Sequence, residues 1–387
     1  MSPTDAPPHP DLHPIVAEIA RPLSHPELLE LAPRPLRGLP RIEPTPDPRL
    51  DAATVAQAFA AAPHDFQACR LAFLAGCMLE LWPGFDDEGL VAAALLERAP
   101  ALTLAAAKAS RVLLRPPEVL DFRGLAARVG IHWDPGVPAL LGAHLLGLGL
   151  MTALARSPAL RAQARAQGEL VGAVTVLCET VAELDPLRLL LDNVEQLTLL
   201  VLHPEQRRGF VIEAERVRNG FQLFALLDDR LLGASDPRPL HGPLVDPAVG
   251  AVARGEPVAL DQERLTSPHG FYNWSAWTRG GLAADRAARL VWGELPIHRI
   301  PPLPRLDPTP VVILGTPWLD RGWPPSEITP LHPELRPQLT LVRTLDAEEV
   351  AEWLARIDAA PEPQRAALRY ATTAPPPVPP GDPDRAP

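Results

Sequence analysis

The first half of the chain carries the hydrophobic spacing of α-helices. From residue 51 to about residue 193, apolar side chains recur every three or four positions, which gathers them on one face of each helix. Asp51 is suited to cap the first helix, Pro83-Gly84 to end the second, and Ser157-Pro158 to begin a later one. The two clearest stripes are Val55, Ala58, Phe59 and Ala62, followed by Phe66, Cys69, Phe73, Cys77 and Leu81. We therefore predict an all-helical domain over residues 50–194.

Near residue 195 the spacing changes from helical to alternating. Residues 197–202, 209–217 and 220–227 alternate in a way that predicts three strands. Asn219-Gly220, between the last two, is a strong signal for a tight hairpin turn. Within 209–217, Phe210, Ile212 and Ala214 share one side, so we expect a sheet with one packed and one wet face.

Further elements complete this second domain. Residues 309–315 and 338–343 are expected to form buried strands, and Asp346 with Glu349 predicts a capped final helix. Residues 195–360 should therefore form an α+β domain. The predicted fold class is α+β, with a helical N-terminal domain followed by a mixed, largely antiparallel sheet domain with helices.

Prolines are concentrated at both ends of the chain. There are 50 prolines in 387 residues, about 13% against an average near 5%. Thirteen lie in residues 1–49 and nine in residues 361–387. We expect a proline-rich N-terminal arm over residues 1–49 and a disordered proline-rich tail over residues 361–387. Because 47% of the whole chain is apolar, a sizeable core must lie between them.

Charge narrows the list of partners. The chain has 47 acidic and 36 basic residues, for a net charge of −11, which argues against a nucleic-acid surface. The only lysine, Lys108, has no phosphate-binding loop before it, so we expect it on a helix surface. The excess of arginine over lysine is typical of a GC-rich bacterial genome.

The cysteines and the N-terminus suggest a compartment. Cys69, Cys77 and Cys178 show no CxxC spacing and lie in apolar runs, as reduced core thiols do. The N-terminal residues lack the basic and apolar regions of a secretory signal. We expect a cytoplasmic protein.

One segment opens a membrane alternative. Residues 137–155 carry no formal charge over a length that could span a bilayer. His144, Pro138 and three glycines lower the hydrophobicity of the segment, and a buried core helix produces the same pattern. We favour the core helix, and membrane association through residues 137–155 remains the alternative.

The most unusual stretch follows residue 266. It combines Tyr272, Asn273, Trp274 and Trp277, and six of the eight tryptophans follow residue 270. Aromatic side chains with hydrogen-bonding groups are typical of protein-contact surfaces. We predict a protein-binding surface at these four residues. The alternative is that the aromatic rings fill the core of the sheet domain.

Catalytic and metal-binding patterns are weak. Ser275 lies outside a GxSxG elbow, the histidines form no HxH or HExxH pair, and residues 311–317 lack a GxGxxG loop. Asp228-Asp229, like the acidic residues 86–88, is expected to cap a helix or face solvent. No metal and no cofactor are predicted.

These patterns favour a non-enzymatic, protein-binding accessory or adaptor component of a bacterial multi-protein system. Its partners would be other proteins of the same system, with no nucleic acid. The alternative is a hydrolase-like enzyme of unrecognised class, with a pocket formed by His269, Asn273, Ser275 and His298.

Overall fold

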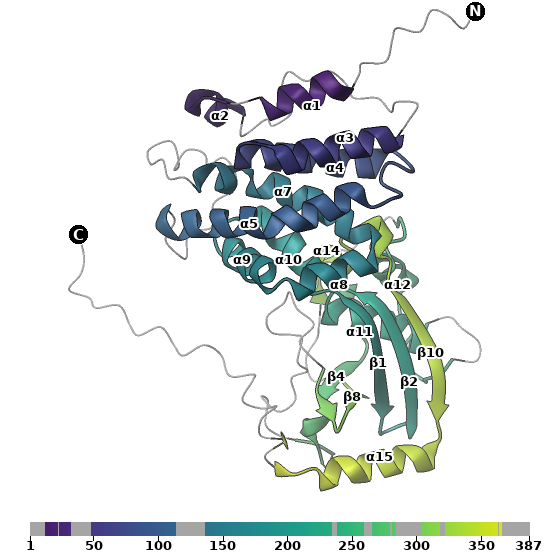
Figure 1. Cartoon of the computed structure of the whole chain (residues 1–387). Helices are drawn as coiled ribbons and strands as arrows, with labels where there is room; N and C mark the ends of the chain where they lie inside the picture. The colour runs from purple at the N-terminus through teal and green to yellow at the C-terminus, as the bar shows by residue number, and fades with distance from the viewer. Residues whose placement is uncertain are drawn as a thin grey trace, which may run out of the picture. The chain divides into compact units, whose positions relative to one another are not determined.

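The chain divides into two compact units, Met1–Leu191 and Asp192–Pro387. The computed structural model describes residues 12–21, 23–31, 48–113, 136–233, 238–258, 265–278, 281–283, 303–317, 322–362 and 364–365. Helices make up the first unit and a mixed sheet with helices the second, so the α+β fold class is as predicted (Figure 1). The predictions for most of the N-terminal arm and for residues 366–387 lie outside the described residues.

The helical unit is built around α7. Its described helices are α1 (Leu12–Ala20), α2 (His25–Leu31), α3 (Pro48–Ala61), α4 (Asp65–Leu81), α5 (Leu90–Leu113), α7 (Val137–Arg156), α8 (Pro158–Ala166), α9 (Gly168–Cys178), η1 (Ala182–Leu184) and α10 (Asp185–Leu191). Helix α7 packs mainly against α4 and α5 (Figure 1). Ser157 caps α8 by accepting a hydrogen bond from the Leu160 amide at 3.3 Å, as expected of a serine before a helical proline. Helix α3 begins at Pro48, which places Asp51 inside its first turn instead of at its cap.

Helices α4 and α7 approach each other closely because glycines meet at their contact. A Cβ atom added to Gly76 would lie 2.8 Å from the Cα of Gly149, and one added to Gly149 would collide with the carbonyl oxygen of Ala72. Two backbones can pack this closely only where side chains are missing. The buried face of α4 therefore includes its small residues, while Leu81, predicted to be part of the apolar stripe, is 71% exposed.

Arginine side chains close helix C-termini in this unit. The Nη1 atom of Arg161, a residue only 1% exposed, donates to the carbonyl oxygens of Leu154 and Ala155 at 2.6 and 2.8 Å, at the end of α7. Arg98 does the same beyond α3, where its Nη2 donates to Ala62 at 2.8 Å. The last carbonyls of a helix have no partner within it, so a guanidinium fork satisfies several of them at once.

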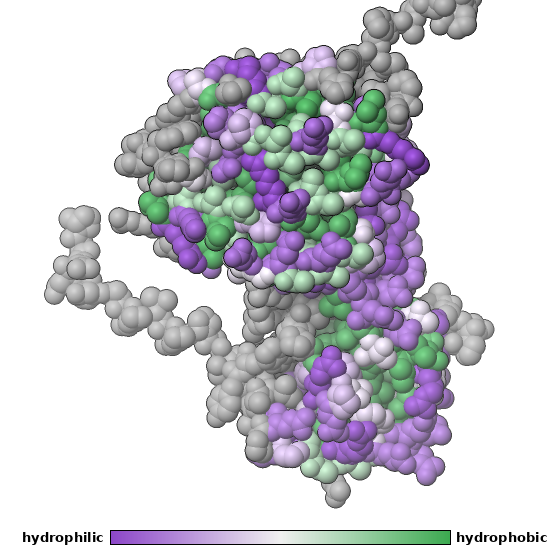
Figure 2. Space-filling view, viewed as in Figure 1, coloured by the Kyte–Doolittle hydropathy of each residue, from purple (hydrophilic) through white to green (hydrophobic). Residues whose placement is uncertain are grey.

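Among the described residues of this unit, α5 and α7 are long and apolar enough to span a membrane. In α7, 72% of the most apolar window is buried inside the structure, as in the core helix of a globular unit. On the face shown in Figure 2, polar and apolar residues are interspersed over the helical unit.

The second unit contains a six-stranded sheet with the order β10-β2-β1-β8-β4, and β7 pairs with β8 outside this path. Strands β1 and β8 are parallel and the other pairs are antiparallel. The elements are β1 (Val194–His203), β2 (Arg208–Val217), α11 (Gly220–Leu232), α12 (Pro247–Ala253), β3 (Leu265–Thr266), β4 (Gly270–Asn273), η2 (Trp274–Ala276), β5 (Trp277–Thr278), β6 (Gly281–Leu282), β7 (Arg305–Leu306), β8 (Thr309–Gly315), β9 (Gly322–Trp323), α14 (Pro325–Ile328), η3 (Pro333–Leu335), β10 (Gln338–Leu345) and α15 (Ala347–Ala359).

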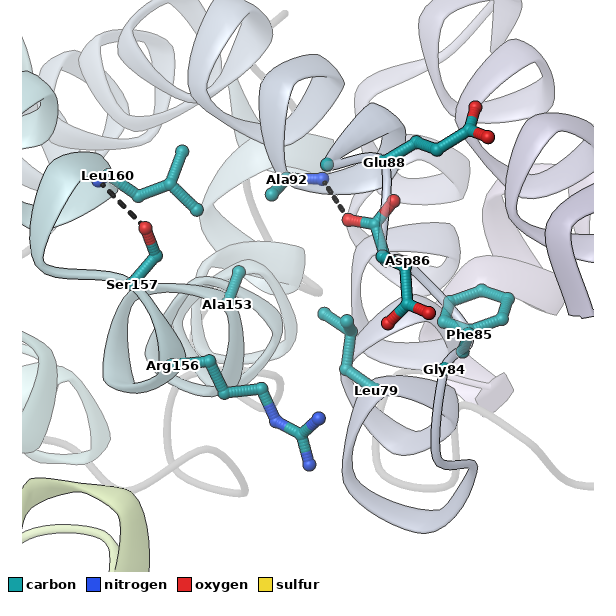
Figure 3. A pocket seen from close by; sticks show the side chains of 12 residues that line it. Leu79, Gly84, Phe85, Asp86, Glu88, Ala92, Ala153, Arg156, Ser157 and Leu160 are labelled. Atoms are coloured by element: carbon teal, nitrogen blue, oxygen red, sulfur yellow. Dashed lines mark hydrogen bonds between the residues drawn. The ribbon is translucent and has the colours of Figure 1, made fainter.

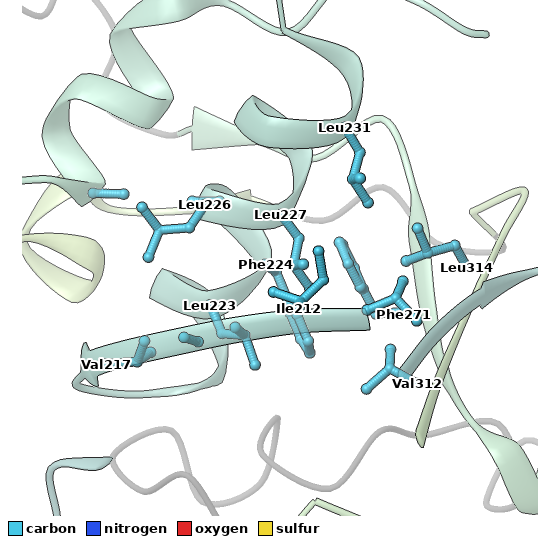
Figure 4. Close-up of a cluster of buried hydrophobic side chains, with 14 of the residues drawn as sticks. Ile212, Val217, Leu223, Phe224, Leu226, Leu227, Leu231, Phe271, Val312 and Leu314 are labelled. Carbon is cyan, nitrogen blue, oxygen red and sulfur yellow. The ribbon is translucent and has the colours of Figure 1, made fainter. Parts of the chain in front are cut away.

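Each face of the sheet has its own core. Successive residues of β1 alternate between them, with Val201 in the core beneath α11 and Leu202 in the core beneath α15. In the α11 core, the rings of Phe224 and Phe271 stack with their centroids 4.1 Å apart (Figure 4). On β2, Ile212 lies in this core, and the alternation of its neighbours is as predicted. The expected wet face was wrong, because half-buried Val211 packs against the second core beneath α15.

The prediction of a strand over residues 220–227 was wrong, because this segment begins helix α11. The Asn219 side chain accepts a hydrogen bond from the Gln222 amide at 2.8 Å, which is a helix N-cap and not a hairpin turn. Asparagine favours both structures, and a short apolar run fits either period. The outer strand β10 is also more exposed than expected, because it lies at the edge of the sheet.

The ordered chain continues past α15. Asp346 and Glu349 form the predicted capping box at the start of this helix. Arg365 is only 7% exposed, and its Nη1 donates to the carbonyl oxygen of Trp277 at 3.0 Å. The expected disordered tail over 361–387 therefore does not begin at residue 361, since a buried arginine fixes the segment after α15 to the body of the unit.

Candidate functional site

The aromatic stretch lies in the interior of the sheet unit. Tyr272 and Trp274 are 0% exposed and Asn273 is 2% exposed, while Trp277 is half-buried. Tyr272 and Trp274 pack in the core beneath α15, and the Tyr272 hydroxyl donates to the carbonyl oxygen of Thr316 at 2.5 Å. The prediction of an exposed protein-binding surface is wrong for these three residues. Their aromatic rings instead fill the core, which was the alternative.

The proposed grouping of His269 with Asn273 and Ser275 is not formed either. The pairing of β4 with β8 places Gly270 opposite Gly315 and Asn273 opposite Val312, so His269 and Ser275 lie beyond opposite ends of β4. The Asn273 side chain accepts a local hydrogen bond from the Ser275 amide at 3.0 Å. His298 lies outside the described residues.

His269 has a different set of partners. Its Nδ1 lies 3.2 Å from Oδ1 of Asp228, and the exposed fractions of the two side chains are 8% and 2%. The Ser267 hydroxyl donates to the other oxygen of the same carboxylate. Asp228 comes from α11, and the two others come from the loop that enters β4. Folding thus brings together residues about 40 positions apart in the sequence.

A second histidine packs against this group. His203, the last residue of β1, places its ring edge-to-face with that of His269, with the centroids 5.5 Å apart. Burial, followed by the nearby His269, lowers the pKa of His203 to about 4. The Nδ1 atom of His203 accepts a hydrogen bond from the backbone amide of Gln206 at 3.4 Å. His203 is therefore neutral at physiological pH.

The side chains of His203, Asp228, Ser267 and His269 lie at one end of the sheet strands. The parallel strands β1 and β8 end there, at His203 and Gly315, and antiparallel β4 begins there. All four residues are buried, and Ser267 and His269 keep the largest exposed fractions, 8% and 6%. The carboxyl ends of parallel strands are where open α/β sheets place their ligand sites. We call Asp228, Ser267, His269 and His203 the histidine cluster.

The hydrogen bonds limit what the histidine cluster can do. A carboxylate accepts, so the imidazole of His269 donates from Nδ1 and presents Nε2 as its basic nitrogen. No described residue bonds to that Nε2. The Ser267 hydroxyl bonds to the Asp228 carboxylate and to the backbone of His269, but not to its imidazole, so Ser267 is not arranged as the nucleophile of a serine triad. Among the described residues, no group of three or more His, Cys, Asp or Glu side chains is placed to hold a metal ion.

The sequence reasoning missed Asp228, Ser267 and His203. Asp228 was expected to cap a helix or face solvent, and that expectation was wrong, because it lies near the C-terminal end of α11 and is buried. A signal was present in the spacing. Phe224, Asp228 and Leu231 follow at i, i+4 and i+7, so a helical interpretation of this segment would have placed the carboxylate on the apolar stripe.

Comparisons with protein-family models, with curated proteins and with solved structures found no match to this chain. A functional proposal therefore depends on the geometry of the histidine cluster itself.

Proposed function

We propose that the protein is a hydrolase-like enzyme in which His269, oriented by Asp228, is the general base. The observation that supports this is the buried pair between His269 Nδ1 and Asp228 Oδ1, 3.2 Å apart, with Nε2 left for a substrate or water. Buried pairs of titratable groups at the end of a sheet are typical of acid–base sites. The burial of Tyr272 and Trp274 removes the surface on which the adaptor hypothesis depended.

The proposed reaction uses water as the nucleophile. Nε2 of His269 takes a proton from the water as its oxygen attacks an ester carbonyl or a phosphoryl centre. The imidazolium, stabilised by Asp228, then returns that proton to the leaving oxygen, so water is added across the cleaved bond. Ser267 holds the second carboxylate oxygen in place, and neutral His203 adds no competing positive charge.

The test uses Asp228→Asn, which preserves shape but removes the negative charge that fixes the His269 tautomer. We expect hydrolysis of p-nitrophenyl esters or phosphoesters by the full chain to fall by roughly 10²–10⁴-fold, with the melting temperature nearly unchanged. His241→Ala, which removes an exposed imidazole of the same unit, is the matched control and should retain wild-type turnover. Equal turnover by wild type and Asp228→Asn across the set of substrates would contradict the proposal.

A further inference from the structure

The helical unit contains an open pocket that is separate from the histidine cluster. It has a volume of about 410 Å³ and lies between the end of α4, the loop 82–89, the first turn of α5 and the junction of α7 with α8. Leu79, Phe85, Ala92 and Ala153 form its apolar lining, and all four are at most 6% exposed. Figure 3 shows the acidic loop on one side of this space and Arg156 on the other. We call it the α4–α8 pocket.

The acidic wall is held in a fixed shape. The Asp86 carboxylate accepts hydrogen bonds from the amides of Val91 and Ala92 at 3.0 and 2.9 Å, which caps α5 (Figure 3). Gly84 and Gly89 have φ values of +77° and +71°, which other residues rarely adopt. A loop fixed in this way loses little conformational entropy when a partner binds.

Two charged groups remain uncommitted on opposite sides of the pocket. The Asp86 carboxylate caps α5, and Glu88 forms an ion pair with Arg49 at 3.4 Å. Asp87 and Arg156 are both exposed, and neither has an ion-pair or hydrogen-bond partner among the described residues. An occupant that satisfied both would present a positive and a negative group, with apolar surface between them.

Two exposed leucines lie at the ends of the helices that the acidic loop connects. Leu81 ends α4 and is 71% exposed, and Leu90 begins α5 and is 42% exposed, so they flank the acidic loop. Exposed apolar side chains beside a rim of charges are typical of protein-contact sites. A small ligand confined to the pocket would leave both leucines in water, whereas a polypeptide segment could cover them.

We propose that the α4–α8 pocket binds a short segment of another protein. An apolar side chain of that segment enters the pocket, an arginine or lysine pairs with Asp87, and an acidic residue pairs with Arg156. The net charge of −11 of this chain favours the approach of a partner with a basic segment. The proposal assigns a binding surface to the helical unit and does not depend on the hydrolytic function of the sheet unit.

The test begins with random twelve-residue peptides displayed on phage and selected against the full chain. We expect the selected peptides to share an apolar residue between a basic and an acidic one. Affinity is then measured by fluorescence anisotropy with one synthetic peptide of this kind. Asp87→Lys should weaken binding by about tenfold, since one close charge pair becomes a repulsion. A peptide with its basic residue changed to Glu should recover affinity for Asp87→Lys.

The controls separate a local effect from a general one. Glu97→Lys makes the same charge change at an exposed position outside the pocket, on α5, and should leave the affinity for the peptide unchanged. Arg156→Glu should weaken binding and be rescued by a peptide whose acidic residue is changed to Lys. Selected peptides without a basic residue, or equal binding to wild type and Asp87→Lys, would overturn the proposal. A dimer in sedimentation experiments that Asp87→Lys dissociates would also overturn it, because the occupant would then be a second copy of this chain.

Discussion

The two units of this protein differ in where they place their distinctive side chains. In the sheet unit, Tyr272, Trp274 and the histidine cluster are buried. In the helical unit, exposed Leu81 and Leu90 lie beside a charged loop and an open pocket. Rarity of a residue type therefore does not indicate exposure in this chain. Among the described residues, the exposed large apolar side chains are leucines and valines, whereas Trp82, Trp274 and Trp323 are buried.

Two sets of polar side chains, one in each unit, also have different kinds of partner. In the helical unit, Arg161 and Arg98 donate to backbone carbonyls at helix ends. In the sheet unit, Asp228, Ser267 and His269 bond to one another. A guanidinium on carbonyl oxygens stabilises the fold and keeps its charge near neutral pH. A bonded carboxylate and imidazole can exchange a proton, which is why we place chemistry in the sheet unit.

The largest expected effect tests the difference in burial. Trp274→Ala should lower the free energy of unfolding by about 3–5 kcal/mol, because it removes a fully buried indole from the core beneath α15. Leu81→Ala, a matched truncation of an exposed residue, should change it by less than about 0.5 kcal/mol. Urea unfolding followed by circular dichroism measures both. Similar losses for the two variants would show that the assignment of core and surface is incorrect.

The next effect compares buried His203 of the sheet unit with partly buried His144 of the helical unit. Burial lowers the pKa of His203 to about 4, and burial likewise lowers the pKa of His144, in α7, to about 4. The unfolded chain binds these protons near pH 6.5, so stability is full above that value and is lost as the pH falls from about 6.5 to 4. Complete protonation would cost up to about 3 kcal/mol for each group.

Replacing each histidine by Gln should flatten the dependence of the unfolding free energy on pH over that range. Tryptophan fluorescence is suited to His203, because six of the eight tryptophans follow residue 270. Circular dichroism at 222 nm reports the unfolding of helices, so it is suited to His144, which lies in a helix of the helical unit. An unchanged slope in His203→Gln would show that His203 is not held neutral by the fold.

Much of the fold could be predicted from local spacing. The helical first half, strands β1, β2 and β8, and the capping box of α15 each depend on residues close together in the sequence. The error at residues 220–227 arose because Asn219 and a short apolar run fit two structures equally well. Only the packing of α11 on the sheet, with Phe224 against Phe271, decides between them.

The candidate site was less predictable for a physical reason. His269 was singled out, but its partner Asp228 lies 41 residues away, and no local pattern reports a pairing over that distance. The exposure of a side chain could not be predicted from local sequence either, because it depends on which distant segments cover that side chain. Trp274 is buried because α15, more than 70 residues later, helps to close the core over it.

A smaller effect tests the role of arginine in the helical unit. Arg161→Met should retain much of the apolar contact of the side chain but remove the guanidinium donor from the carbonyl oxygens of Leu154 and Ala155, which leaves Leu154 with the Ser157 amide at 3.4 Å. We expect a loss of about 2 kcal/mol in unfolding free energy, within the range for unsatisfied buried groups. The loss should be the same at pH 6 and pH 8, because a guanidinium carries the same charge at both. A pH-dependent loss would erase the distinction drawn between the two units.

The smallest predicted effect concerns the start of α11, the helix that carries Asp228. Asn219→Ala removes the N-cap acceptor for the Gln222 amide and the Nδ2 donor to the Glu327 carbonyl oxygen, and should cost about 1–2 kcal/mol, whereas Asn219→Ser keeps an N-cap acceptor and should cost less. Because α11 positions Asp228 against His269, fraying at this end should lower hydrolytic turnover far less than Asp228→Asn does. Urea unfolding and p-nitrophenyl turnover of the same samples test both points. A loss of turnover as large as that of Asp228→Asn, at nearly full stability, would place the reacting centre near Asn219 instead of at His269.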